Sequence, residues 1–225
     1  MKVLLLYTSH RQVEELEIAQ GIYNKNDFLK QMDVLLHCNN PSIDKKKIAG
    51  IIDGFDAPGK KVIFSEQNSG HHSGVAEAIH SIYEQLKEYD FVIHTHPDVF
   101  LVHTKKLEET LHAYATEDVD YIVWDIPRTV AWEATIRENE YTSDFFIFRP
   151  KEENNIFRHY YEYWEKNPSS GCERFLHYAI HKDHLKVGRL DRDPYAAMIP
   201  KSSPEPFGIW HCHHLPHLKE YMRDV

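Results

Sequence analysis

Short apolar runs alternate with segments of helical period along the first 125 residues of the chain. Continuous apolar runs of this length are typical of buried strands, and they predict strands at 3–7, 34–37, 62–64, 90–93 and 121–124. Between them, apolar residues recur at helical spacing and predict helices at 13–23, 44–52, 76–86 and 104–115, with a shorter helix near 28–32. This alternation is the signature of a mostly parallel sheet flanked by helices.

The last hundred residues follow a less regular pattern that is rich in aromatic side chains. The predicted elements there are a strand at 145–148 and helices at 156–164 and 172–181. Residues 126–142 have no clean period, and we find no linker, internal repeat or low-complexity tract. We therefore expect an α/β fold in one domain over 1–225, built from two functional halves at 1–125 and 126–225.

Charge and cysteine content exclude some classes of function. The chain carries 26 Lys and Arg against 35 Asp and Glu, a formal charge of −9, which is poorly suited to nucleic-acid binding. Its three cysteines are far apart, imply no disulfide framework and favour a reducing compartment. The apolar run at the N-terminus is too short for a signal peptide or a membrane span. We expect a cytoplasmic protein with no nucleic-acid partner and no transmembrane segment.

The stretch 61–101 reads as strand, polar turn, helix and strand, and it contains the first candidate site. Its turn runs from Asn68 to Gly70, and its last strand ends in the tip HTHPD, which contains His96 and Asp98. Both polar segments fall at the carboxyl ends of strands, where ligands bind in open parallel sheets. The turn is suited to a ribose or phosphate, and Asp98 to a hard divalent cation. The alternatives are an ordinary polar turn and an Asp that caps a turn.

Two further acids and one tryptophan are candidates for chemistry on a substrate. Glu173 opens a predicted helix after a Ser/Gly loop, and Asp144 comes just before a strand. Either is suited to take a proton from a hydroxyl, although Glu173 is equally a first-turn acid and Asp144 equally a turn residue. Trp132 lies in the aperiodic stretch among charged neighbours, where an exposed ring is suited to stack on a sugar.

The segment WHCHHLPH at 210–217 is the densest cluster of metal-ligand side chains in the chain. Alternate residues of an extended segment face opposite sides, so at most half of these side chains can meet one ion. Cys38 and Cys172 have no CxxC partner, which disfavours a closed zinc site. We favour one tail histidine joining Asp98 on a cation, with packing alone as the alternative.

Taken together, these segments resemble a nucleotide-sugar glycosyltransferase of the GT-A fold. The matching features, in chain order, are a first strand with a polar tip, the turn NSGHHSGVAEAI, the strand FVIHTHPDVFL, the segment YTSDFFIFRP, the helix start CERFL and the late histidine of IWHCHH. The resemblance covers nearly the whole chain and implies one GT-A-like domain. In it, 1–125 is the nucleotide-sugar half, and 126–225 is the acceptor half with a tail that completes a metal site.

The resemblance also implies a metal site around the strand tip. Asp98 takes the place of the second acid of the family's Asp-x-Asp motif, which binds Mn²⁺ or Mg²⁺ beside the diphosphate of the sugar donor. His96 stands where the first acid is expected and is assigned to donor binding. This departure leaves a side chain that is still a competent ligand for first-row metals. His211, or failing that His213, is expected to complete the metal shell.

The remaining implied roles concern the nucleotide and the acceptor. The residues expected to line the nucleotide pocket are Thr8, Ser9, Arg11, Asn68 and Gly70. Glu173 resembles the helix-start acid that serves as base in inverting members, with Asp144 in reserve.

The implied reaction moves a hexose or pentose from a nucleotide-diphosphate sugar to a hydroxyl of a sugar, glycan or lipid-linked acceptor. It is expected to depend on a metal and to invert the anomeric carbon, with a retaining mechanism as the alternative. A nucleotidyltransferase is the first competing function, but the tip TSHR has no glycine-rich basic loop. The second is a non-catalytic module that binds sugar or metal, which the departure at His96 keeps open.

Overall fold

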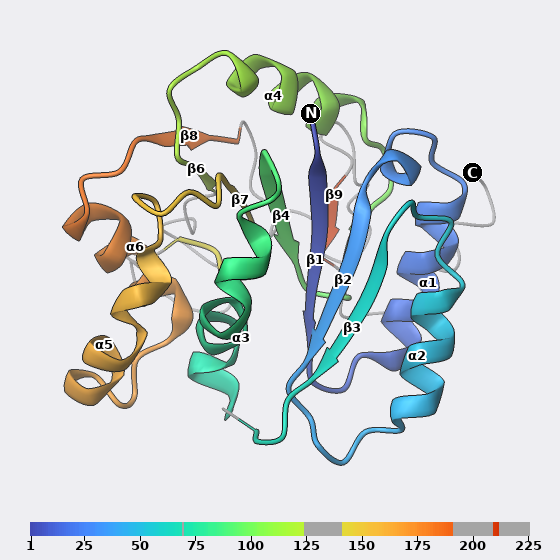
Figure 1. The fold of residues 1–225 in the computed structure, drawn as a ribbon, viewed down its shortest axis with the longest axis horizontal. Helices are drawn as coiled ribbons and strands as arrows, with labels where there is room; N and C mark the ends of the chain where they lie inside the picture. The colour runs from blue at the N-terminus through green and yellow to red at the C-terminus, as the bar shows by residue number, and fades with distance from the viewer. Residues whose placement is uncertain (69, 124–140, 191–208, 212–225) are drawn as a thin grey trace, which may run out of the picture.

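The structure is a computed structural model that describes residues 1–68, 70–123, 141–190 and 209–211, with the backbone alone given at 71, 72, 210 and 211. Figure 1 shows a twisted sheet at the centre of the molecule, with helices packed on both sides. The predicted positions of Trp132 and His213 lie outside the described residues, as does the side chain of His211.

Seven strands form the central sheet in the order β3-β2-β1-β4-β7-β6-β8. The strands are β1 (Val3–Ser9), β2 (Asp33–Cys38), β3 (Lys60–Phe64), β4 (Phe91–Thr95), β6 (Tyr121–Val123), β7 (Phe145–Phe148) and β8 (Val187–Arg189). The first four are mutually parallel, whereas β7 runs antiparallel to β4 and β6. The predicted α/β fold with a mostly parallel sheet is therefore confirmed.

The helices cover the two faces of this sheet and enclose one apolar core on each side. They are α1 (Val13–Asn24), α2 (Lys45–Asp53), α3 (Gly70–Leu86), α4 (Lys105–Ala115), α5 (Tyr160–Lys166) and α6 (Cys172–Lys182), with 3₁₀ turns η1 (Leu29–Gln31) and η2 (Ile156–His159). In β1, Leu5 and Tyr7 pack with residues of α1, α2 and α4, whereas Leu4 and Leu6 pack with residues of α3, α5 and α6. Because both faces are covered, β1 is apolar along its length instead of alternating.

The first four strands end at one edge of the sheet, and a small second sheet forms beyond β4. Its strands are β5 (Val99–Leu101) and β9 (Ile209–His211), which pair in antiparallel fashion. In this register His211 lies opposite Val99, the residue that follows Asp98. The backbone of Trp210 and His211, the first two residues of the histidine-rich segment, therefore lies beside the strand tip that contains the candidate metal ligand.

Several predicted element boundaries differ from the structure. The strand β1 continues through Thr8 and Ser9, and α3 begins at Gly70, six residues before the first apolar position of its predicted face. The predicted helix at 156–164 is a 3₁₀ turn followed by a short α-helix, and the one near 28–32 is a 3₁₀ turn alone. Thr104 precedes α4, but its hydroxyl bonds to Asn26 instead of capping the helix.

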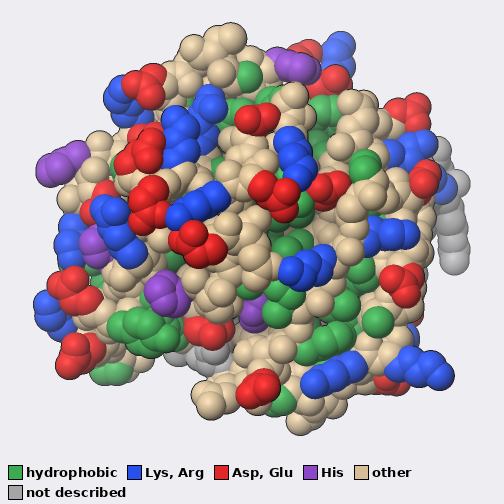
Figure 2. Space-filling model, in the orientation of Figure 1, with side chains coloured by type: hydrophobic (Ala, Val, Ile, Leu, Met, Phe, Trp, Pro, Cys, Tyr) green, Lys and Arg blue, Asp and Glu red, His purple; other side chains and the backbone are tan. Residues whose placement is uncertain are grey.

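Charged side chains of both signs are interspersed over the face drawn in Figure 2, with no broad basic patch among the described residues there. Ion pairs at the surface of the described part of the chain include Lys2 with Glu88 and Lys87 with Glu84. Within the described part of the chain, no helix is long and apolar enough to cross a membrane.

Candidate active site at the carboxyl edge of the sheet

The end of β4 and the segment that leads into β7 are joined through His96 and Asp144. The backbone N–H of His96 donates to the carbonyl of Asp144 at 3.0 Å. The His96 Nδ1 lies 3.2 Å from the Asp144 carboxylate, and both side chains are mostly buried. This contact follows from the antiparallel pairing of β4 with β7, in which Thr95 lies opposite Phe145. Two of the predicted site residues are therefore in direct contact.

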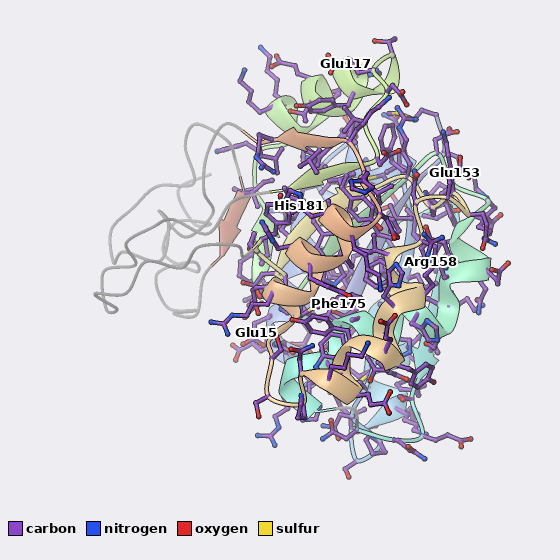
Figure 3. All side chains as sticks on the ribbon, turned by 90° about the vertical axis from the view of Figure 1, so that its left-hand side faces the viewer. Glu15, Glu117, Glu153, Arg158, Phe175 and His181 are labelled. Atoms are coloured by element: carbon purple, nitrogen blue, oxygen red, sulfur yellow. The ribbon has the colours of Figure 1, made fainter. Side chains whose placement is uncertain are left out.

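Glu173 lies in the first turn of α6 and is held by the same segment. The Ser143 hydroxyl donates to Glu173 Oε1 at 2.7 Å. The backbone N–H of Tyr141 donates to the carbonyl of Glu173 at 3.3 Å. Figure 3 shows α6, labelled at Phe175 and His181, lying across the side of the molecule nearest the viewer. The residues 141–144 thus place both candidate bases, Asp144 and Glu173, at one edge of the sheet.

The charges of these acids act together on His96. Burial lowers the pKa of His96, but the hydrogen bond and charge of Asp144, with the charges of Asp98 and Glu173, raise it above its ordinary value of 6.5 overall. Asp98 is buried, with 7% of its surface exposed. Asp144 therefore contacts the imidazole directly, while Asp98 and Glu173 act on its pKa through their charge.

A second histidine of β4 connects this cluster to β1. His94 is fully buried, stacks on Phe146 with ring centroids 4.6 Å apart, and its Nε2 lies 2.8 Å from the Thr8 hydroxyl in a hydrogen bond. Burial, and after it the charge of His96, lowers the pKa of His94 well below 6.5, against a smaller opposing effect of Asp144. His94 is therefore neutral at physiological pH.

We predict that this buried histidine makes folding sensitive to acid. Its folded pKa lies below the unfolded value of 6.5, so the unfolded chain binds more protons as the pH falls through that value. The stability that His94 contributes is complete above pH 6.5 and falls below it, by up to about 1.4 kcal/mol per pH unit. The raised pKa of His96 acts in the opposite sense, so the measurement must isolate His94.

The measurement is urea unfolding of wild type and His94→Gln at two pH values. One is about one pH unit above the ordinary histidine pKa of 6.5, and the other is about one pH unit below it. At the lower pH, the free energy of unfolding should fall more in wild type than in His94→Gln. His112→Gln, at a side chain that is 67% exposed on α4, is the control and should show no such shift. A pH-independent difference for His94→Gln would contradict the prediction.

The tips of β1 and β2 form a polar corner beside this cluster. Gln12 Oε1 accepts hydrogen bonds from the Ser9 hydroxyl at 3.2 Å and from the backbone N–H of His10 at 3.1 Å. His10 Nδ1 lies 3.0 Å from Asn39 Oδ1. A Cβ at Gly74 would lie 2.5 Å from Asn39 Nδ2, so the glycine lets α3 approach this corner closely.

The other residues predicted to line the nucleotide pocket are more exposed, and two of them lie further from the tip of β4. Arg11 is exposed at the loop after β1. Asn68 is exposed, and its Oδ1 accepts from the backbone N–H of Gly70 at 2.9 Å. Gly70 has φ +81°, a left-handed conformation that favours glycine at the start of α3. This turn follows β3, which β2 and β1 separate from the tip of β4, so it lies at the far end of the same edge.

Sequence reasoning missed several residues of this edge: His10, Gln12, Asn39, His94, Tyr141 and Ser143. The sequence did contain a signal for Asn39, because this polar residue directly follows a buried strand. Ser9, at the end of β1, and Asp98, shortly after β4, were predicted from the same kind of position. Ser143 and Tyr141 gave no comparable signal, because their partners on α6 are more than 25 residues away in sequence.

Asp98 and the backbone of His211 are the described parts of the predicted metal site. Asp98 offers a buried carboxylate, and the backbone of His211 lies next to it across the β5–β9 pair. A carboxylate with an imidazole fits a first-row divalent ion such as Mn²⁺. Among the described side chains, however, no three His, Cys, Asp or Glu converge as a complete site. The donor set fits the ion chemically only if the tail supplies a further ligand.

No family model and no curated protein matches the sequence. The fold, in contrast, matches solved glycosyltransferase structures. LgtC, as an active-site variant, matches with a TM-score of 0.60 at 14% identity, over 95% of this chain and 88% of that one. TarS of S. aureus in complex with UDP matches with a TM-score of 0.56 at 14% identity, over 99% of this chain and 64% of that one.

A third match is the mannosyltransferase PcManGT from Pyrobaculum calidifontis in complex with GDP-Man and Mn²⁺, with a TM-score of 0.57 at 10% identity. It covers 100% of this chain and 65% of the other. The chain spans between 38% and 65% of the matched TarS and PcManGT chains. These matches extend over nearly all of the chain, and together with the seven-stranded sheet they show that it has the GT-A fold.

Proposed function

We propose that the chain is a nucleotide-sugar glycosyltransferase that moves a hexose or pentose to an acceptor hydroxyl with inversion. The observation that carries this proposal is the contact of His96 with Asp144 at 3.2 Å, in the same segment whose Ser143 holds Glu173 at 2.7 Å, at the carboxyl edge of the sheet. Ligands of open α/β sheets bind at this edge. The likeness in fold to LgtC, TarS and PcManGT adds support, since the last two are described with UDP and with GDP-Man.

Glu173 is the proposed base. Its carboxylate accepts the Ser143 hydroxyl at Oε1, which fixes the side chain, and the second oxygen, which lies close to Gly171, is proposed to take the proton of the acceptor hydroxyl. The acceptor oxygen attacks the anomeric carbon as Glu173 takes its proton, the bond from that carbon to the diphosphate breaks, and the configuration inverts. Asp144 is the reserve candidate, but its carboxylate already contacts His96.

His96 and the tips of β1 and β2 form the proposed sugar-donor side. The raised pKa of His96 favours its protonated form, which suits contact with a diphosphate. Thr8 and Ser9 are buried at the end of β1 and shape the floor of this side, while Arg11, Asn68 and Gly70 line its rim.

Asp98 and one histidine of the tail are the proposed ligands of Mn²⁺ or Mg²⁺. When bound, such an ion neutralises the charge of the departing diphosphate. The pairing of β5 with β9 supports this assignment, because it brings His211 into register with Val99. His211 is the first candidate for the second ligand, and His213 is the next.

The test is a thermal-shift screen of the purified chain against UDP-, GDP-, dTDP- and CDP-sugars, with and without Mn²⁺. A ligand that binds only the folded state stabilises it by mass action and so raises the unfolding temperature. The gain in the free energy of unfolding is about 2.7 kcal/mol at a hundredfold excess over Kd. We expect one nucleotide to stabilise the chain and Mn²⁺ to increase the effect. Inorganic phosphate with Mn²⁺ is the control for general anion binding.

Nucleoside triphosphates and free sugars, added to the same screen, separate the proposal from its competitors. Nucleotide-sugar stabilisation followed by transfer to a hydroxyl acceptor would support it. Stabilisation by nucleoside triphosphates alone would point to a nucleotidyltransferase, and stabilisation by free sugars alone to a non-catalytic module. No response to any nucleotide-sugar would contradict the proposed function.

A further inference from the structure

A row of aromatic rings on the outer side of α5 has no part in the proposed transfer step. It runs from α3 across α5 to α6, and we call it the α5 aromatic surface; its members are His80, Tyr160, Tyr161, Trp164 and Tyr178. Of the three large hydrophobic side chains that are exposed among the described residues, two belong to it, namely Tyr161 at 70% and Tyr178 at 40%. The other members are half-buried. Figure 2 shows hydrophobic side chains gathered where α5 lies in Figure 1.

The rings of the α5 aromatic surface hold one another in place. Tyr160 stacks on His80 with ring centroids 5.7 Å apart, and Tyr161 meets His80 edge-on at 5.2 Å. The rings of Tyr160 and Trp164 are 5.1 Å apart, and Trp164 packs in turn on the buried ring of Phe175 at 4.8 Å. The outer rings are therefore fixed on the core beneath α6. Aromatic side chains that are ordered in this way lose little freedom when a ligand binds.

The loop between α5 and α6 connects this surface to Glu173. The carbonyl of Ser170 accepts the indole N–H of Trp164 at 3.3 Å, and the Ser170 hydroxyl lies 2.7 Å from the hydroxyl of Tyr163. The next residue is Gly171, where a Cβ would lie 2.5 Å from Glu173 Oε2. The loop that anchors the rings therefore also borders the carboxylate of the proposed base.

The charges beside the rings favour a neutral ligand. Tyr178 joins the row through Tyr163, with ring centroids 5.0 Å apart, and the Lys182 amine lies 5.4 Å from the centre of the Tyr178 ring. That amine and the amine of Lys166 both donate to the Glu162 carboxylate at 3.0 Å, and these hydrogen bonds lower the pKa of Glu162 to about 2. Both lysines are thus engaged, and the chain has a formal charge of −9, so an anionic lipid surface is disfavoured.

The shape of the rings selects a sugar among neutral ligands. The C–H groups on the face of a pyranose pack against an aromatic ring, while the hydroxyls at its rim stay in water. Tyrosine, tryptophan and histidine suit this arrangement, because each has an apolar ring face and a polar edge. A row of such rings matches successive units of a glycan better than it matches a single sugar.

We propose that the α5 aromatic surface binds neutral sugar units of a glycan acceptor, beyond the unit that reacts at Glu173. At 1.5 Å of rise per residue, Tyr178 lies about 7.5 Å along the axis of α6 from Glu173. A glycan whose end unit lies at Glu173 places its following units on the rings. That the glycan is the acceptor rests on the proposed function, whereas the sugar-binding surface itself does not.

The test uses four neutral oligosaccharides as probes: maltohexaose, cellohexaose, mannohexaose and chitohexaose. In protein labelled with ¹³C in its tyrosine rings, the signal of Tyr161, assigned through Tyr161→Phe, should shift in a saturable manner with at least one probe. Titration calorimetry with that probe gives the Kd. Tyr161→Ser should weaken the Kd by about three- to tenfold, as expected for the loss of one aromatic ring contact.

Tyr161→Phe is the matched control, because it keeps the ring and removes only the hydroxyl, and it should keep the Kd of wild type. Tyr161 is 70% exposed, so both variants should stay folded, which circular dichroism checks. Equal weakening in both variants, or no saturable shift with any of the four probes, would overturn the proposal. So would self-association in analytical ultracentrifugation that Tyr161→Ser abolishes, since it would identify an interface between copies of the chain.

Two further measurements keep this proposal distinct from the proposed function. The thermal shift with the nucleotide-sugar should be the same for wild type and Tyr161→Ser, whereas the KM for the oligosaccharide as acceptor should rise in Tyr161→Ser. Nucleotide-sugar binding without an oligosaccharide response overturns the sugar-binding surface alone. An oligosaccharide response without nucleotide-sugar binding, or with an unchanged KM, keeps the surface and overturns its assignment to an acceptor.

Discussion

Glu173→Gln should lower the rate of sugar transfer by about 10²–10⁴-fold while leaving the affinity for the nucleotide-sugar unchanged. The amide cannot take a proton from the acceptor, but it keeps an oxygen that can accept the Ser143 hydroxyl. Among the described residues, Glu173 hydrogen-bonds with Ser143 and Tyr141 and with no residue at the tips of β1 and β2, so the nucleotide side should remain intact. Steady-state kinetics gives the rate, and thermal shift with the nucleotide-sugar gives the affinity.

Two further variants make this result specific. Glu165→Gln, at an exposed position of α5, changes the charge equally and should leave the rate unchanged. Asp144→Asn tests the reserve candidate, because its carboxylate contacts His96. A large loss of rate in Asp144→Asn with none in Glu173→Gln would assign the base to Asp144. A collapse of nucleotide-sugar affinity in Glu173→Gln would make Glu173 a binding residue instead.

The sequence pattern was sufficient for the sheet because hydrophobic period and strand length are local properties. Val3 to Tyr7 is a continuous apolar run, and such a run is stable only where helices cover both faces of the strand. The order of the strands is not local. Nothing in the run Phe145–Phe148 encodes that it lies between β4 and β6 and antiparallel to both.

The same distinction applies to the site. Residues that end a strand, such as Thr8 and Asp98, can be assigned to the carboxyl edge from the chain alone. The distance between two such residues along the edge depends on strand order, which is why Asn68 lies two strands further from the tip of β4 than a simple βαβ unit suggests. The Ser143–Glu173 contact depends on how α6 packs, and no periodic pattern encodes that contact.

The proximity of His211 to the tip of β4 lies between these two cases, because the sequence hinted at it without a periodic pattern. The density of histidines in 210–217 and the departure at His96 together suggested that a distant segment completes the site. The pairing of β5 with β9 brings the backbone of His211, near the start of that segment, opposite Val99. The described backbone is compatible with that expectation and does not test it. Whether the side chains bind a metal stays a prediction.

Asp98→Ala should abolish transfer without unfolding the chain, and this is the largest loss that we expect. A divalent ion contributes several kcal/mol to a transfer step, so losing it lowers the rate by about 10³-fold or more. Asp98 is a buried polar residue that belongs to neither apolar core cluster, so we expect the fold to survive. The measurements are transfer rate, circular dichroism, and the increase in thermal shift that Mn²⁺ gives with the nucleotide-sugar, which should disappear.

The controls for Asp98→Ala separate the loss of a ligand from the loss of a charge. Asp98→Asn keeps the shape but is a poorer ligand for a hard cation, so it should lose most of the activity as well. Asp118→Asn removes a carboxylate that is 78% exposed and should have no effect. His211→Ala should reproduce the loss of the Mn²⁺ effect if the tail supplies the second ligand, and His213→Ala should reproduce it instead if the register of the tail differs. Near-normal turnover in Asp98→Ala would refute the metal assignment. Transfer would then proceed without the buried carboxylate that we propose as a ligand of the ion.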